Sequence, residues 1–136
     1  MKIVIDANIL IAALIKDSKA REIITSQEFE FLTPEFILEE IRKYREEIKK
    51  KANLDQEGFE LVMSILFETI KIIPKEDYEL SLDKAKEIMN DDVKDVPYVA
   101  VQLALNCDGI WTNDQHFKDK RIRLFNARDL MDLSAL

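Results

Sequence analysis

The sequence contains few of the residues that usually interrupt or cross-link a chain. Its 136 residues include 2 Gly, 3 Pro and 1 Cys. We find no flexible linker, no low-complexity stretch and no repeat with a period of about 20 to 50 residues. The length therefore predicts a single domain covering residues 1–136. The lone Cys107 excludes an intramolecular disulfide and a cysteine-rich zinc module.

Long apolar runs are also missing. None approaches the roughly 18 to 20 residues that a membrane-spanning helix needs. The first ten residues, MKIVIDANIL, do not have the layout of a signal peptide. We therefore expect a cytoplasmic protein. The apolar share of 47% is normal for a globular core, so a disordered acidic tail is excluded.

Positive charge is scarce relative to negative charge. The chain has 20 Lys and Arg against 27 Asp and Glu, so its formal net charge is −7. Proteins that bind the nucleic-acid backbone usually carry an excess of Lys and Arg. The charge balance alone therefore argues against a nucleic-acid partner. The positions of the acidic residues in the sequence say more about function than their number does.

Short apolar runs alternate with segments of helical periodicity. The predicted strands are 2–5, 29–33, 69–73, 109–112 and 122–125, and the predicted helices are 9–14, 20–24, 34–51, 54–68, 78–89, 95–106 and 127–133. Pro34 is expected in the first turn of the third helix. This alternation predicts an α/β fold with a mostly parallel sheet covered on both faces. In such sheets the ligand crevice lies at the carboxyl ends of the strands.

Acidic residues follow two of the predicted strands. Asp6 closes the first strand, and Asp114 stands two residues after Thr112, which closes another. If both strands are central and parallel, the two carboxylates reach one crevice from distant parts of the sequence. The alternative is that Asp6 is a turn or N-cap residue, although Asn8 could do that job equally well.

Two neighbouring glutamates in the long predicted helix face different ways. At about 100° per residue, the apolar side chains form one buried stripe. Glu40 lies about 70° from the centre of that stripe, at the border between core and water, whereas Glu39 lies about 170° away. Glu40 is therefore the one that can enter a crevice. The stripe consists of Ile37, Ile41, Tyr44 and Ile48.

Asp95 is a fourth candidate, and its simplest role is the N-cap of a helix with Pro97 in the first turn. Gathering carboxylates is costly, because two charges about 4 Å apart repel by roughly 4 kcal/mol at an effective dielectric constant of 20. Protonation or a cation usually offsets that cost. Oxygen ligands without Cys or His favour Mg²⁺ or Mn²⁺, the ions of phosphoryl transfer and phosphodiester hydrolysis.

Four segments resemble the motifs of PIN-domain nucleases, in the expected order and over nearly the whole chain. They are 4–10, 34–41, 95–100 and 111–117, whose sequences are VIDANIL, PEFILEEI, DVPYVA and WTNDQHF. The resemblance implies a three-layer α/β/α fold and a metal-dependent endoribonuclease. It also implies that one or two Mg²⁺ or Mn²⁺ ions are held by Asp6, Glu40, Asp95 and Asp114. Asn8 and Thr112 would orient those ligands.

The resemblance also suggests partners. Many small PIN proteins are toxins of VapBC-type toxin–antitoxin pairs, blocked by a partner with a basic tail, and homodimers are common. Lys43 and His116 are candidate contacts to an RNA substrate, although both are also ordinary surface residues. Two alternatives stay open: an RNA-processing or quality-control PIN nuclease without an antitoxin, and a non-catalytic RNA-binding scaffold on the same fold.

Overall fold

The computed structural model describes residues 1–90, 93–114, 117 and 121–134. Within these residues, five strands form one sheet in the order β3-β2-β1-β4-β5, and every neighbouring pair is parallel. The strands are β1 (Lys2–Ile5), β2 (Glu30–Pro34), β3 (Ile70–Ile73), β4 (Gly109–Trp111) and β5 (Leu124–Phe125). The predicted α/β class and parallel sheet are confirmed.

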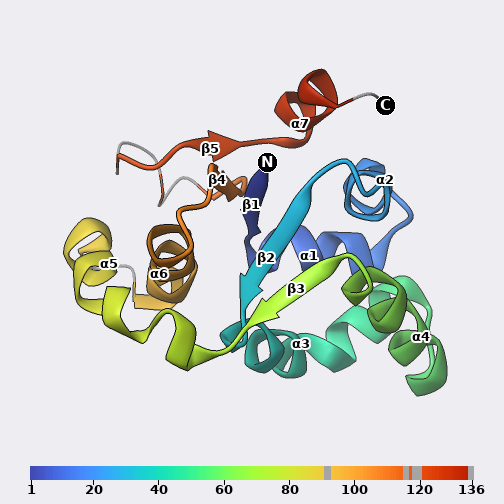
Figure 1. The fold of residues 1–136 in the computed structure, drawn as a ribbon. Coiled ribbons are helices and arrows are strands. Elements are labelled where there is room, and N and C mark those ends of the chain that lie inside the picture. Colours follow the sequence, from blue (N-terminus) through green and yellow to red (C-terminus); the bar gives the residue numbers. More distant parts are fainter. Residues whose placement is uncertain (91–92, 115–116, 118–120, 135–136) are drawn as a thin grey trace.

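Helices cover both faces of the sheet (Figure 1). Helix α6 lies against β1, β2 and β4 with α5 packed on it, whereas α1, α3 and α4 form the other layer. The α-helices are α1 (Ala7–Ile15), α2 (Lys19–Thr25), α3 (Phe36–Ala52), α4 (Gln56–Phe67), α5 (Leu82–Met89), α6 (Val96–Ala104) and α7 (Ala127–Leu133). Short 3₁₀ turns are η1 (Lys75–Asp77), η2 (Glu79–Ser81) and η3 (Val93–Asp95). In the described part of the chain, no helix is both long and apolar enough to cross a membrane.

The core lies on both sides of the central strand. Ile3, Val4 and Ile5 of β1 are all completely buried, because helices cover the side chains that point to either face. This two-sided burial explains why β1 is a continuous apolar run instead of an alternating one. Cys107 and Trp111 are buried in this core as well.

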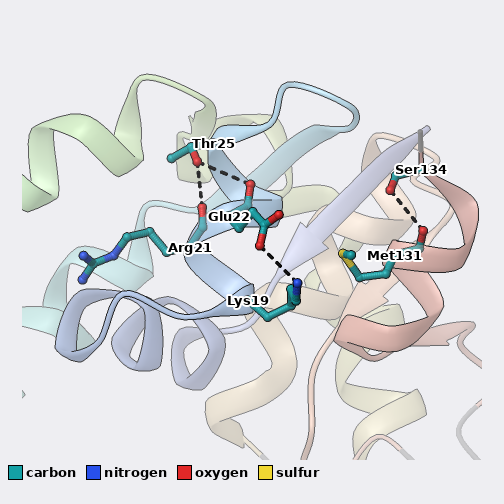
Figure 2. A network of polar contacts seen from close by, with 6 residues as sticks. All are labelled: Lys19, Arg21, Glu22, Thr25, Met131 and Ser134. Carbon is teal, nitrogen blue, oxygen red and sulfur yellow. Dashed lines mark hydrogen bonds and ion pairs between the residues drawn. The ribbon is translucent and has the colours of Figure 1, made fainter. Parts of the chain in front are cut away.

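Helices α2 and α7 contact each other near the edge of the molecule, and their polar contacts are local (Figure 2). The Thr25 hydroxyl donates to the carbonyl oxygen of Arg21 at 2.9 Å, and the Ser134 hydroxyl donates to that of Met131 at 3.1 Å. The Arg21 Nε donates to the Ala13 carbonyl at 2.9 Å, near the last turn of α1. The bonds to the Ala13 and Met131 carbonyls stabilise helix ends, where carbonyl groups lack partners within the helix.

One prediction about Pro34 is wrong. The residue is the last one of β2, and α3 begins only at Phe36. A proline suits this place because the pairing of β1 with β2 ends at Val4 and Leu32, so no partner strand requires an N–H from Pro34. On the opposite side the chain still pairs with β3, where the Glu35 N–H donates to the Ile73 carbonyl at 2.9 Å.

Two other boundaries differ from the prediction. The helix expected over 78–89 begins at Leu82, because the preceding residues form the 3₁₀ turns η1 and η2. The strand expected over 122–125 is only Leu124–Phe125. The remaining elements agree with the predicted ones to within a few residues, and such differences are usual at the ends of elements.

Candidate functional site

The strand order reverses direction between β1 and β4, and a ligand site is expected at the ends of these two strands. From β1 the chain continues to β2 and β3 on one side of the sheet, whereas β4 and β5 lie on the other side. In open α/β sheets, ligands bind at such a reversal, outside the carboxyl ends of the strands. Ile5 and Trp111 are paired at the ends of these two strands. The next residues, Asp6 and Thr112, are therefore neighbours across the sheet.

Asp6 and Thr112 are joined directly. The Thr112 hydroxyl donates a hydrogen bond of 2.6 Å to the Asp6 Oδ2, and both residues are buried, with exposed fractions of 5% and 4%. The same hydroxyl oxygen accepts a bond of 2.9 Å from the backbone N–H of Asp114. Asp6 occupies the N-cap position of α1, but among the described residues its side chain makes no capping hydrogen bond. Its carboxylate is oriented by Thr112 instead.

The environment of Asp6 disfavours its charged form. Burial raises the pKa of its carboxyl above the ordinary value of 3.8, and the charge of Asp114 raises it further. The Thr112 hydroxyl and the nearby backbone N–H groups of Ala7 and Asn8 lower the pKa, but the net shift is upward. No lysine or arginine among the described residues forms an ion pair with Asp6. A negative charge at this position is therefore incompletely compensated.

Glu40 faces the same region from α3. Its side chain is partly buried whereas Glu39 is exposed, which confirms the faces predicted from the helical spacing. Burial raises the pKa of Glu40 above 4.5, the charge of Asp6 raises it further, and Lys94 and Lys43 lower it. A hollow of about 210 Å³ lies beside this carboxylate, lined by Phe36, Glu39, Glu40, Lys43 and Lys94.

The other predicted site residues occupy different positions around these two. Asp95 is 8% exposed and stands at the N-cap of α6 with Pro97 in the first turn, as predicted, although the described residues include no capping bond from its side chain. Asp114 is partly buried, and Asn8 at the start of α1 is exposed. The candidate substrate contact His116 lies outside the described residues.

The chemical types of these side chains suit a hard divalent cation. Carboxylate and hydroxyl oxygens are suitable donors for Mg²⁺ or Mn²⁺, and a cation would neutralise the incompletely compensated charge of Asp6. However, the described residues include no group of three or more His, Cys, Asp or Glu side chains placed to hold one metal ion. The donor types that such an ion prefers are nevertheless present around Asp6.

Two residues near the carboxylates were not identified as site residues from the sequence. Lys94 lies in η3 and lines the hollow beside Glu40. Tyr98 of α6 is 1% exposed, and burial raises the pKa of its hydroxyl, as do the charges of Glu40, Asp6 and Asp95 and the nearby Tyr78. Tyr98 follows Asp95 by three positions, a spacing that places both on one side of a helix and that could have identified it.

The raised pKa of Asp6 predicts how the stability of the metal-free protein depends on pH. The folded state holds the proton of Asp6 to a higher pH than the unfolded state, so this group contributes most to stability below about pH 3.8, and the contribution is lost as pH rises through the folded pKa. In EDTA, Asp6→Asn should therefore be more stable than the wild type at pH 7, by a margin that shrinks toward pH 4. Urea denaturation at a series of pH values measures this.

Glu57→Gln, which changes an exposed carboxylate in the first turn of α4, is the control and should show no comparable gain at pH 7. If Asp6→Asn were clearly less stable than the wild type at pH 7, the Asp6 carboxylate would be a structural cap instead of a strained group.

Comparison with known proteins agrees with the architecture. A family model described as the PIN domain matches residues 4–128, which include Asp6, Glu40, Asp95 and Asp114. A search of curated proteins found no match to the chain. The matched residues run from the second half of β1 through β5 and include the reversal at which Asp6 and Thr112 meet. Because the match spans most of the sequence, this chain belongs to the PIN-domain family, with the three-layer α/β/α fold of that nuclease family.

Proposed function

We propose that this chain is a metal-dependent endoribonuclease that hydrolyses RNA phosphodiester bonds. The observation that carries the proposal is the buried Asp6 carboxylate at the reversal of the sheet, oriented by Thr112 and facing the negative charges of Asp114 and Glu40. A buried carboxylate whose charge is incompletely compensated lowers the stability of the folded state. Stabilising the fold therefore does not explain why Asp6 is there. Perturbed carboxyl groups of this kind are typical of functional sites. Membership of the PIN-domain family also supports a nuclease.

Asp6, Glu40, Asp95 and Asp114 are the residues that would hold Mg²⁺ or Mn²⁺, one ion or two. When bound, such an ion neutralises phosphate charge and activates water for phosphodiester hydrolysis. The protein must hold the carboxylates in place, and the 2.6 Å bond from Thr112 does this for Asp6. We also assign Asn8, which is exposed at the start of α1 two positions after Asp6, to orienting a metal ligand.

The hollow beside Glu40 supports a path for the RNA backbone. Lys43 and Lys94 line it from α3 and η3, and both carry positive charge close enough to lower the pKa of Glu40. Ammonium groups attract phosphate without reading the base sequence. We therefore assign Lys43, together with Lys94, to contacts with phosphates that flank the cleaved bond. Local positive charge at this position would offset the net charge of −7 that otherwise repels RNA.

Cleavage of single-stranded RNA tests the proposed activity. With Mn²⁺ the wild type should cut, and EDTA should abolish cutting. Asp6→Asn and Glu40→Gln should each lower the rate by about 100-fold or more, because each removes a charged ligand. Glu57→Gln is the control, since Glu57 is an exposed carboxylate in the first turn of α4 and does not line the hollow beside Glu40, and it should keep nearly full activity. Cleavage that persists in EDTA would contradict the metal-dependent mechanism.

Salt dependence tests the phosphate contacts. The double variant Lys43→Ala/Lys94→Ala should raise the KM for RNA several-fold with a smaller change in kcat, because it removes charges that bind phosphates away from the reacting bond. The slope of log binding constant against log salt should fall by about 0.7 for each phosphate that is no longer neutralised. Lys19→Ala/Arg128→Ala removes two charges from α2 and α7 and should leave KM unchanged. Equal slopes in all three proteins would contradict the assignment.

We further propose that the chain is the toxin of a VapBC-type pair. Its four motifs resemble those of PIN-domain nucleases, many small members of which are such toxins, and clustered acids in a chain of net charge −7 suit a partner with a basic tail. If a small basic-tailed protein is encoded directly upstream, adding it in equimolar amount should suppress RNA cleavage. Deleting its basic tail should restore cleavage. Undiminished cleavage in the presence of that protein would favour an RNA-processing nuclease without an antitoxin.

A further inference from the structure

The hydroxyl group of Tyr98 is buried and has no hydrogen-bond partner among the residues that the structure describes. The residue is 1% exposed, so bulk water does not supply a partner either. An unpaired hydroxyl in a protein interior is unfavourable, and such groups are uncommon enough to require an explanation. A phenylalanine would fill the same space without this cost. The hydroxyl is therefore a feature that core packing does not account for.

The surroundings of Tyr98 connect it to the carboxylates. Its ring packs edge-on against Phe36, with ring centroids 6.4 Å apart and an interplanar angle of 73°. Phe36 lies in the first turn of α3, and Glu40 follows it by four positions on the same side of that helix. Asp95 precedes Tyr98 by three positions at the start of α6. Tyr98 thus lies where the start of α6 contacts the first turn of α3, with Glu40 on α3 and Asp95 at the N-cap of α6.

Charge interactions agree with this placement. The charges of Glu40, Asp6 and Asp95, in that order, add to the effect of burial in raising the pKa of the Tyr98 hydroxyl. The phenol therefore stays protonated and can act as a neutral hydrogen-bond donor to a carboxylate. Within the described part of the chain, Glu40 forms no hydrogen bond or ion pair, whereas Asp6 already accepts from Thr112. An unpaired donor and an unpaired acceptor thus lie in the same region.

We propose that Tyr98 is a positioning residue of the cation site, whose hydroxyl donates a hydrogen bond to the Glu40 carboxylate when a divalent cation is bound. This inference rests on the proposed function. It assigns to Tyr98 the part that Thr112 plays for Asp6: a buried hydroxyl holds one carboxylate oxygen and leaves the other to the cation. A neutral donor suits this purpose, because it orients the ligand without competing with the cation as a second positive charge would.

Direct measurement of Mn²⁺ binding by calorimetry, without RNA, tests the inference. Tyr98→Phe removes only the hydroxyl, and it should weaken Mn²⁺ binding by about 10- to 100-fold, the range usual for groups that orient metal ligands. Its melting temperature in EDTA should equal or exceed that of the wild type, because an unpaired buried hydroxyl is removed. This combination separates positioning from packing. An unchanged Kd for Mn²⁺ in Tyr98→Phe would overturn the inference.

Tyr78→Phe is the matched control. Tyr78 is also buried, but the carboxylates that raise its pKa are Glu35 and Glu39, which are not proposed ligands. It should bind Mn²⁺ like the wild type. An equal loss of affinity in Tyr78→Phe and Tyr98→Phe would contradict a specific role for Tyr98.

A double-mutant cycle identifies the partner of the hydroxyl. In a Glu40→Ala background, Tyr98→Phe should cause no further decrease in Mn²⁺ affinity. If the two substitutions instead lowered the affinity independently, so that their fold-changes multiplied, the assignment of Glu40 as the partner would be overturned. If the wild type binds no Mn²⁺, both this inference and the proposed function fail. If the wild type binds Mn²⁺ and Tyr98→Phe binds it equally well, only this inference fails.

Discussion

The bond from Thr112 to Asp6 is the contact on which the rest of the site depends. It joins the ends of two strands that are 106 residues apart in the sequence and adjacent in the sheet. Because the Thr112 hydroxyl also accepts from the Asp114 N–H, a single side chain sets the position of one acid and the backbone direction of another. Parallel pairing of β1 with β4 makes this possible, since it brings both carboxyl ends to the same edge of the sheet.

The carboxylates around this bond lower the stability of the folded protein. Burial raises the pKa values of both Asp6 and Glu40, the charge of Asp114 adds to the shift of Asp6, and the charge of Asp6 adds to that of Glu40, so the metal-free protein holds charge in an unfavourable place. The large apolar core, which includes the completely buried β1 residues, supplies the stability that offsets it. The unpaired hydroxyl of Tyr98 belongs to the same group of locally unfavourable features, and all of them lie around the same few carboxylates.

Much of this arrangement could be predicted from residue spacing because the relevant rules are local. Helical periodicity separated Glu40 from Glu39 correctly, and a short apolar run followed by Asp6 identified the central strand and its acidic end. Pro34 was predicted in a helix, but it lies at the end of a strand. A strand tolerates a proline there because β1 no longer pairs with β2 at that position, and local sequence patterns do not show where such pairing ends. Tyr98 was overlooked for a related reason: an aromatic residue on an apolar helix is normally core, and only its neighbours reveal the unpaired hydroxyl.

The amino-acid sequence by itself determined the α/β class, the order of the elements and the choice of candidate acids, because these follow from periodicity and from residue type. Only the tertiary structure decided that β4 lies beside β1, that Thr112 binds Asp6, and that Lys94 and Tyr98 lie near Glu40. Those relations join segments far apart in the chain. They depend on the order of the strands and on the packing of the helices. Local conformational preferences do not determine either one; both follow from burying the apolar side chains in one shared core.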